Sequence, residues 1–558
     1  MKRTHIFLII TLGLLGGCNT QPIQPIIQFQ DDVTKQICVA NWDANKDGEI
    51  QFTEVSTVST LGNVFQSTDI TSFEELQHFT SLDEIGWEEF RECSKLKNIV
   101  IPNSVSKIGK RAFFNCASLQ SVNIPCNVRT IGDGAFCYCT GKITINSNFL
   151  IGVNYEENIN PSKTWLYGAN FSSIHIGNSV SQIGDYALAY CTKLTSITIG
   201  NGVCSMGFDA CSNCWSLKSI VIPESVKNIC PGAFSNCRNL ESVTLPNSIE
   251  KIDWFVFAEC SSLEKVIIPN SVKEIGVGAF RNCSKLNNVV LGTNVFHVGS
   301  EAFFGCSSLT NITIPTSILW FDEDVFKGCV ALPIENDIRY ADTYVVEAVN
   351  KTMASYKIKE GSRIIGDKAF MDCKNLKTIS LPESITTIGD EVFKGCTNLK
   401  QTIIHEKVSS IGPDAFYGCT GELQINSNLV EEDYELIERP GSVVPSRTYK
   451  ESSNYWLDNS NFSKITIGDN IQKLGSNIFY GRWHLKTIVI PKDILSIGDG
   501  ALGNCDKLTH IYCKAEFPPM TNSLGVKKEC VIHVPKQSVA DYKSIPQWGK
   551  YTIVAYEN

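Results

Sequence analysis

The sequence predicts a β-rich solenoid, a right-handed superhelix in which each short coil contributes one short parallel strand and a small helical turn. Two observations lead to this prediction. Cysteines recur at intervals of 23 residues through most of the chain, and each interval repeats the same order of apolar, proline, glycine and aromatic positions. Such a period indicates a repeat protein, whose units bury their apolar faces only against one another. The 558 residues therefore form mainly one long domain, not the three or four compact domains that length alone indicates.

One coil reads C-x-x-L-x-x-I-x-I-P-x-S-V-x-x-I-G-x-x-A-F-x-x. The alternation in L-x-x-I-x-I predicts a strand that proline ends, and S-V-x-x-I-G predicts a second extended stretch. We expect the turn glycine to require positive φ or tight stacking of coils. Asp133, Asp185, Ser300 and Asp390 follow that glycine as expected N-caps of the next turn. The repeating cysteines are Cys93, Cys116, Cys139, Cys191, Cys214, Cys237, Cys260, Cys283, Cys306, Cys329, Cys373, Cys396, Cys419 and, one step after Arg482, Cys505.

The N-terminus predicts export and lipid anchoring. Residues 1–17 carry Lys2 and Arg3 and then a ten-residue apolar run, which is too short to cross a bilayer and indicates a cleaved signal peptide. Leu15-Gly16-Gly17-Cys18 resembles a bacterial lipobox, which implies acylation of Cys18. By the same resemblance, the residue after Cys18, which is not aspartate, favours the outer membrane. The alternative is an ordinary signal peptide followed by a chance cysteine. Residues 18–32 are polar and proline-containing and suit a tether.

A calcium loop is predicted within residues 33–62, an EF-hand-like segment with short flanking helices. Residues 43–54 match D-x-[DN]-x-[DN]-G-x5-E at every fixed position. The expected ligands are Asp43, Asn45, Asp47, the backbone carbonyl of Glu49, Gln51 and Glu54. Because only one such loop is visible, we expect a structural site with an affinity of ~10⁻⁴ to 10⁻³ M. The alternative is an Asx-rich turn that binds no metal.

The remaining boundaries follow the repeat. Residues 63–92 have an apolar residue at every third position and predict an N-terminal capping coil. The solenoid runs over 93–512 with inserts at about 146–167, 333–349 and 427–458, and the altered composition of 513–558 indicates a C-terminal cap. The stretch near 333–349 is expected to be a shortened coil that keeps the register.

The repeat resembles the BspA-like, Treponema-type leucine-rich repeats of anaerobic bacterial surface proteins, over roughly residues 70–535. The resemblance implies a bent, elongated solenoid at the cell surface that acts as an adhesin for host matrix proteins or other bacteria. The chain departs from the pattern where Cys230, Asp253 and Asp322 replace the turn glycine.

The outward strand positions are the candidate ligand face, since small hydroxyl and amide side chains dominate there. The alternatives are a merely solvated strand face and recognition by the insert loops. The candidate residues are Asn98, Ser121, Asn123, Ser173, His175, Ser196, Thr198, Ser219, Ser242, Thr244, Asn311, Thr313, Thr378 and Ser380.

The cysteine ladder favours buried packing over redox or zinc chemistry, because its members occupy inward repeat positions. Cys513 and Cys530 are a candidate disulfide of the C-terminal cap. No H-E-x-x-H, G-x-S-x-G or phosphate-loop motif occurs, so we expect no enzyme and no small-molecule substrate.

Composition narrows the function further. The chain has 49 basic and 58 acidic residues, a net charge of −9 and no basic run, which disfavours nucleic-acid binding. We therefore expect an exported, lipid-anchored monomer at the bacterial outer membrane or cell surface that binds host or bacterial proteins or glycans and carries structural calcium. The alternative function is a scaffold of the envelope that binds only its own partner proteins.

Overall fold

The computed structural model describes residues 25–148, 164–431 and 455–556. The signal peptide, Cys18 and most of the first and third inserts lie outside these ranges. The chain forms two compact units, one of residues 1–149 and 160–180 and the other of residues 150–159 and 181–558. No helix within the described ranges is long and apolar enough to cross a membrane.

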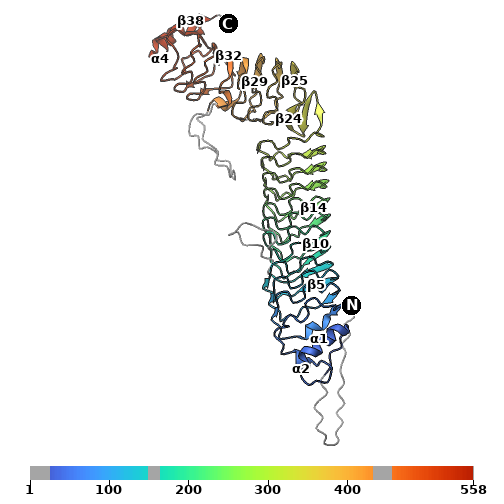
Figure 1. Ribbon diagram of the computed structural model, residues 1–558. Helices are drawn as coiled ribbons and strands as arrows, with labels where there is room; N and C mark the ends of the chain where they lie inside the picture. Colours follow the sequence, from blue (N-terminus) through green and yellow to red (C-terminus); the bar gives the residue numbers. More distant parts are fainter. Residues whose placement is uncertain (1–24, 149–163, 432–454, 557–558) are drawn as a thin grey trace. The chain divides into compact units, whose positions relative to one another are not determined.

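The first unit begins with helices and continues as stacked coils (Figure 1). The helices are α1 (Asp32–Trp42), α2 (Phe52–Val55) and the 3-10 helix η1 (Glu74–His78). A parallel sheet has the order β1 (Ser72–Phe73), β3 (Asn98–Ile99), β5 (Ser121–Ile124), β7 (Lys142–Ile145) and β8 (Ser173–Ile176). A second sheet joins β2 (Glu84–Ile85), β4 (Lys107–Ile108) and β6 (Thr130–Ile131). Each coil thus holds two short strands, the second in the extended S-V-x-x-I-G stretch.

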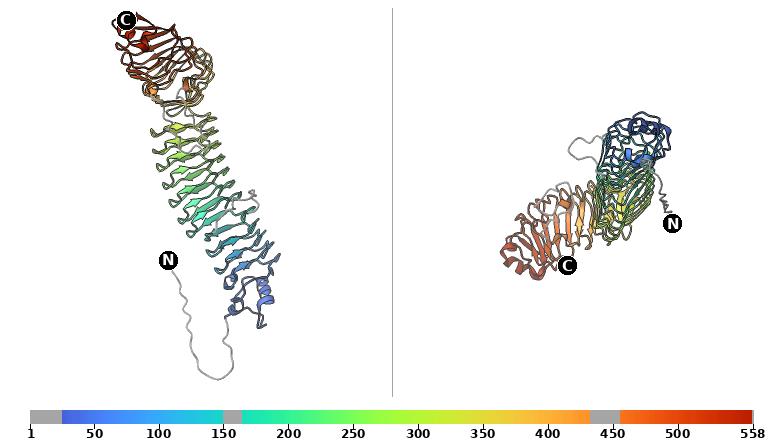
Figure 2. Two further views of the ribbon diagram at one scale, coloured as in Figure 1. Left: turned by 90° about the vertical axis from the view of Figure 1, so that its left-hand side faces the viewer. Right: turned by 90° about the horizontal axis from the view of Figure 1, so that it is seen from below.

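The second unit starts with the same coil, and its strands lie above one another in Figure 2. The main parallel strands are β10 (Ser196–Ile199), β12 (Ser219–Val221), β14 (Ser242–Thr244), β16 (Lys265–Ile267), β18 (Asn288–Val290) and β20 (Asn311–Thr313). The second strands are β9 (Gln182–Ile183), β11 (Ser205–Met206), β13 (Asn228–Ile229), β15 (Lys251–Ile252), β17 (Glu274–Ile275), β19 (His297–Val298) and β21 (Trp320–Phe321). The solenoid prediction is confirmed.

The later coils of the second unit form another main sheet. Its order is β25 (Ser355–Lys357), β27 (Thr378–Ser380), β29 (Gln401–Ile404), β31 (Thr420–Ile425), β32 (Asn461–Ile467), β34 (Thr487–Ile490), β36 (His510–Cys513), β37 (Val531–Pro535) and β38 (Thr552–Tyr556). The second strands are β26 (Ile364–Ile365), β28 (Thr387–Ile388), β30 (Ser410–Ile411), β33 (Lys473–Leu474) and β35 (Ser496–Ile497). Short helices are η3 (Asn428–Val430), η4 (Tyr455–Leu457), η5 (Lys536–Ser538), α3 (Val539–Ser544) and α4 (Pro546–Gly549).

The stretch expected to be a shortened coil is instead an antiparallel β-structure. Strand β22 (Ile334–Glu335) pairs with β23 (Ile338–Ala341), which pairs with β24 (Tyr344–Ala348). Asn336 and Asp337, which join β22 to β23, both have positive φ, at 52° and 62°. Two positive-φ residues give the tight turn that matches the twist of a hairpin. Strand β24 then pairs in parallel with β26, so the coils resume.

Close stacking, and not positive φ, explains the turn glycines. A Cβ on Gly109 would lie 2.6 Å from the carbonyl carbon of Gly86 in the preceding coil, and one on Gly132 would lie 2.4 Å from the amide nitrogen of Lys110. Positive φ occurs two residues later and again just before the cysteine, as at Glu88 and Glu92. A side chain at Gly109 or Gly132 would therefore push neighbouring coils apart.

The turn that follows this glycine forms a third ladder of hydrogen bonds between coils. The backbone N–H groups of Glu88, Phe90 and Glu92 donate to the next coil's carbonyls at distances of 3.1, 2.8 and 2.8 Å. An aspartate expected to cap its own turn also reaches the next coil, since Asp185 Oδ1 accepts from Phe208 N at 2.8 Å. Hydrogen bonds between successive coils are therefore made by the turn as well as by the strands.

Two side-chain ladders fill the core of each unit. Phenylalanine rings stack from coil to coil, with the Phe90–Phe113 centroids 5.2 Å apart and the planes within 8°. The ladder cysteines are buried, and most of them donate Sγ–H to a carbonyl one coil earlier, as Cys116 does to Phe90 O at 3.2 Å. Burial raises the pKa of the Cys396 thiol to about 12. Cys513 and Cys530 are free thiols, so the candidate disulfide is wrong.

Glu89 is a buried carboxyl in the first coils. It is 2% exposed, and burial raises its pKa to about 7, although the backbone N–H groups of Asn63 and Gly86 act in the opposite direction. A raised pKa means that the folded state binds the proton more tightly than the unfolded chain does. The protonated form is therefore the one that the fold favours.

Thiol reactivity should separate two cysteines from the ladder. Cys126 and Cys204 are exposed, and the thiolate is the reactive species. We expect brief alkylation of the native protein, read by peptide mass spectrometry, to label Cys126 and Cys204 first. Cys260 and the other ladder cysteines should react only after denaturation. Rapid native labelling of Cys260 would contradict the packing described above.

Stability should fall as Glu89 ionises. The contribution of its proton is complete below the unfolded pKa of 4.5 and is lost as the pH rises through about 7. The loss should approach about 3 kcal/mol. Urea unfolding of the first unit, followed by hydrogen exchange between pH 4.5 and 8, measures it. Glu89→Gln should flatten this dependence, whereas Glu84→Gln, at a partly exposed carboxylate paired with Lys107, should leave it unchanged.

Candidate functional site

The loop of residues 43–54 lies between two helices of the first unit. Asp31 begins α1 as its N-cap, since its Oδ1 accepts from Thr34 N at 2.9 Å. The helix ends at Trp42, directly before Asp43, and α2 begins at Phe52 with Gln51 and Glu54 bonded reciprocally as a capping box. The second flanking helix is a single turn that ends at Val55.

The loop's carboxylates are directed inward and bind its backbone. Asp43 accepts from Lys46 N at 2.6 Å and from Gly48 N at 2.9 Å. At the other end, Glu54 Oε1 accepts from Ala44 N at 2.9 Å, while Oε2 accepts from Gln51 N at 2.8 Å. Gly48 has a φ of 81°, which glycine adopts without strain. The first and last predicted ligands thus close the loop on itself.

The middle ligands contact one another. Asn45 Nδ2 and Gln51 Nε2 both donate to Asp47 Oδ2 at 2.9 Å. The backbone N–H of Glu49 donates to Asp47 and is the largest cause of the lowered pKa of that carboxyl. The Glu49 side chain turns outward to Lys35 Nζ, 2.7 Å away, which leaves its backbone carbonyl as the predicted donor.

The donor chemistry of this loop fits a hard cation. Its side chains offer three carboxylates and two amides, and Ca²⁺ takes six to eight oxygens of these kinds. Across the part of the chain that the structure describes, no three histidine, cysteine, aspartate or glutamate side chains are grouped to hold a metal. A site in this loop therefore depends on amide and backbone oxygens as well as carboxylates.

A short tether segment, Pro25–Ile27, pairs with the loop. Ile27 N donates to Ile50 O at 2.8 Å, and Ile26 forms an antiparallel bridge with Gln51. Ile27 and Ile50 are both buried. Ile50, the apolar residue at the eighth loop position, thus packs against the end of the tether.

The candidate ligand face consists of in-register ladders along the main sheets. In the first unit Asn98 lies opposite Ser121. In the second unit Ser196, Ser219 and Ser242 are successive partners. Of the fourteen candidate residues, Asn98 and Ser173 are half-buried and the other twelve are exposed. The repeat therefore aligns small polar groups at the spacing of the strands.

Two features of these sheets were not singled out from the sequence. Val221 and Ile267 are 65% and 56% exposed on β12 and β16, so apolar groups interrupt the polar face. At the end of the chain, His510, Tyr512 and His533 gather on β36 and β37. The second feature could have been found in the sequence, because aromatic residues occupy outward strand positions there.

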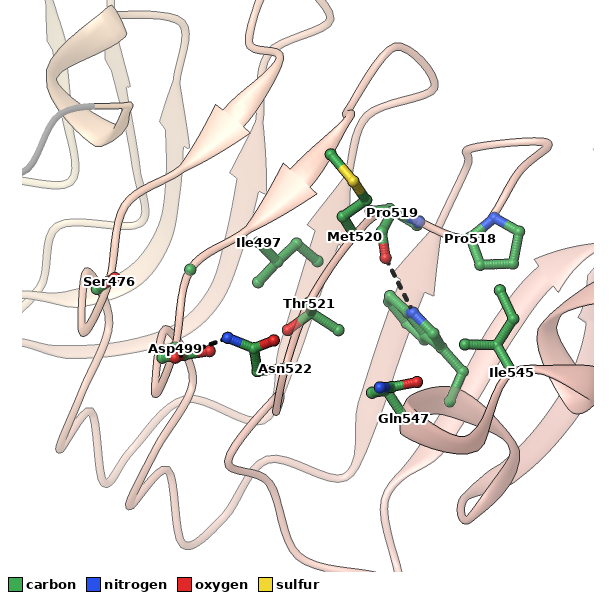
Figure 3. A pocket seen from close by; sticks show the side chains of 12 residues that line it. Ser476, Ile497, Asp499, Pro518, Pro519, Met520, Thr521, Asn522, Ile545 and Gln547 are labelled. Atoms are coloured by element: carbon green, nitrogen blue, oxygen red, sulfur yellow. Dashed lines mark hydrogen bonds between the residues drawn. The ribbon is translucent and has the colours of Figure 1, made fainter.

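A cavity of about 490 Å³ lies beside the C-terminal cap (Figure 3). Trp548 Nε1 donates to Pro519 O at 3.1 Å, and Asn522 Nδ2 donates to Asp499 Oδ2 at 3.0 Å. Asp499 is the one ionisable residue in the lining, beside Ser476 and Thr521.

The sequence matches the family model described as the BspA type leucine-rich repeat region, in six copies. The matched residues are 50–155, 160–214, 205–333, 347–436 and 441–524. No curated protein matches the chain.

Solved structures with likeness to this chain include other bacterial leucine-rich repeat proteins. One from Bacteroides ovatus is 26% identical, with 59% of this chain and 87% of that chain covered and a TM-score of 0.38. The T. pallidum leucine-rich repeat protein is 31% identical, with 30% and 80% covered and a TM-score of 0.29. A leucine-rich cell surface protein from Faecalibacterium prausnitzii is 23% identical, with 59% and 83% covered and a TM-score of 0.26.

Proposed function

The chain belongs to the BspA-type leucine-rich repeat family, and from this premise we propose that it is an exported binding or adhesion module that recognises protein or glycan ligands. The observation that carries the proposal is the exposed polar ladder of the main sheets. Repeat proteins use such extended surfaces for binding. Their families are typically binding modules, and no enzymatic family is indicated.

The chemistry of the ladder supports recognition by many weak contacts. Ser219, Ser242 and their neighbours present hydroxyls at the ~4.8 Å spacing of strands. Each hydroxyl can donate or accept a hydrogen bond, so one face suits either peptide or sugar groups. Exposed Val221 and Ile267 add apolar area between the hydroxyls. Contacts repeated along the sheet can sum to a useful affinity.

The proposal includes attachment to the cell surface through Cys18. Its support is the sequence Leu15-Gly16-Gly17-Cys18 together with the basic and apolar residues before it. Two or more acyl chains bury enough methylene groups, at ~0.8 kcal/mol each, for stable anchoring.

The proposal also assigns structural calcium to the loop. Asp43, Asn45, Asp47, Gln51 and Glu54 would supply side-chain oxygens, and Glu49 its carbonyl. When bound, the ion would neutralise the carboxylates of Asp43, Asp47 and Glu54. Because Ile50 and Gln51 also bond Pro25–Ile27, an ordered loop would hold the end of the tether against the first unit.

Calcium binding should be measurable and should depend on the Glu54 side chain more than on the Glu49 side chain. We expect calorimetry on the chain from Asn19 onward to give about one site with a dissociation constant of ~10⁻⁴ to 10⁻³ M. Glu54→Gln should weaken binding at least ~10-fold, since it removes the bidentate ligand.

The matched control is Glu49→Gln, which changes a carboxylate of the same loop whose side chain contacts Lys35. It should bind calcium nearly as well as the parent chain. If millimolar calcium gave no heat with the parent chain, the calcium assignment would be wrong, and the loop would be an Asx-rich turn.

Adhesion should depend on the strand face. We expect the chain from Asn19 onward to bind immobilised host matrix proteins or whole bacterial cells saturably. Ser219→Glu with Thr244→Glu should weaken that binding at least ~10-fold, about 1.4 kcal/mol, because both add charge and bulk to adjacent rungs.

The charge-matched control is Gln182→Glu with Asn228→Glu, at exposed positions on the second strands β9 and β13. A deletion of residues 432–454 tests the insert loop and spares Leu429 and Val430, which are buried. Loss of binding on deletion, with the strand variant unaffected, would move recognition to the insert. Absence of saturable binding, with co-purification of envelope proteins, would favour the scaffold function.

A further inference from the structure

Two histidines face one another on the last strands of the second unit. His510 Nδ1 lies 3.0 Å from His533 Nε2, and the ring centroids are 5.2 Å apart. The Tyr512 ring stacks on the His533 ring, with a centroid distance of 4.2 Å and an interplanar angle of 8°. All three side chains are half-buried. Such a pair at a partly accessible position has no part in the hydrophobic core.

The sheet register holds this arrangement. Tyr512 lies directly opposite His533, and His510 lies opposite Val531 on the same pair of strands. The three rings therefore project from one face of adjacent parallel strands. Strand β38 pairs with β37 on the far side, with His533 opposite Val554. The His533 ring is thus fixed by strands on both sides and by the stacked tyrosine.

The two facing nitrogens share one proton. A neutral imidazole has one N–H and one lone pair, so one ring donates to the other. Burial, and secondly the neighbouring His510, lower the pKa of His533. An uncharged imidazole nitrogen is a metal ligand.

The separation of the nitrogens fits coordination of one ion. Two ligands at ~2.0–2.1 Å from a metal lie about 2.9 Å apart at a right angle and about 3.3 Å apart at a tetrahedral angle. The observed 3.0 Å is close to the right-angle value. Square-planar or tetragonal geometry with imidazole ligands is typical of Cu²⁺ and Ni²⁺, and Cu²⁺ binds most tightly in the divalent series.

We propose that His510 and His533 form a two-imidazole binding site for a late divalent transition-metal ion, Cu²⁺ foremost, with water in the remaining coordination positions. On binding, the ring that carries the shared proton passes it through solvent to its own remote nitrogen, and both rings tilt so that their lone pairs converge on the ion. Tyr512 is a positioning residue that keeps the His533 ring in place.

This site differs from the calcium loop in donor type. The loop offers carboxylate and amide oxygens, which suit hard cations, whereas imidazole nitrogens suit late transition metals. His175 is an exposed histidine on β8 in the other unit, and no second histidine pairs with its strand. It provides a matched control for binding by one imidazole.

The test is titration of the full exported chain with Cu²⁺, after alkylation of accessible thiols, followed by calorimetry and electron paramagnetic resonance. We expect one site per chain whose spectrum carries hyperfine coupling to two nitrogens. His510→Gln or His533→Gln should weaken binding at least by the ~10–100-fold that loss of an outer-shell partner costs. Tyr512→Ala should give a smaller weakening, and Tyr512→Leu, which keeps an apolar side chain, should lie between.

His175→Gln should leave the affinity and spectrum unchanged. Circular dichroism of each variant checks that the C-terminal strands remain folded. The proposal is overturned if His533→Gln binds as tightly as the parent chain, if His175→Gln causes the same loss, or if the spectrum shows coupling to fewer than two nitrogens.

Discussion

The spacing between coils is the constraint on which the other features depend. Three ladders of backbone hydrogen bonds join successive coils, one in each strand and one in the turn, and all must repeat at ~4.8 Å. A Cβ at Gly109 would fall within 2.6 Å of the coil below, so this position admits only glycine without a local shift. The stacked rings follow the same repeat, since the Phe90 and Phe113 centroids lie 5.2 Å apart.

The same constraint determines what the surface can do. Since each coil repeats the backbone, an outward side chain acquires a neighbour of the same kind one strand away, as Ser219 does in Ser242. Small polar groups thus form ladders, and the surface pattern changes where the repeat is broken. The hairpin β23–β24 and the strands after β36 are such places, because their residues no longer follow the consensus.

The sequence predicted features that depend on local spacing. The turn of residues 43–54 could be predicted from the sequence, since its hydrogen bonds join residues within twelve positions, and the burial of Cys116 followed from its place in the repeat. The turn ladder could not be predicted, because its bonds join residues 22 apart in an unusual alternation of φ. The His510–His533 contact joins residues one repeat period of 23 apart, but the register of β36 and β37 is 21 residues, so the two rings meet diagonally and not as direct partners.

Cysteine suits the ladder position because it both fills space among the stacked rings and donates a weak hydrogen bond to a carbonyl. Phe90 O already accepts from Cys93 N in its own turn, and the Cys116 thiol of the next coil adds a second, weaker donor. Alanine would leave a void, and serine would bury a more strongly polar group among stacked rings. Burial that raises the pKa of Cys396 to about 12 also suppresses the thiolate. A long row of ladder thiols can therefore stay reduced by packing alone, without a disulfide framework.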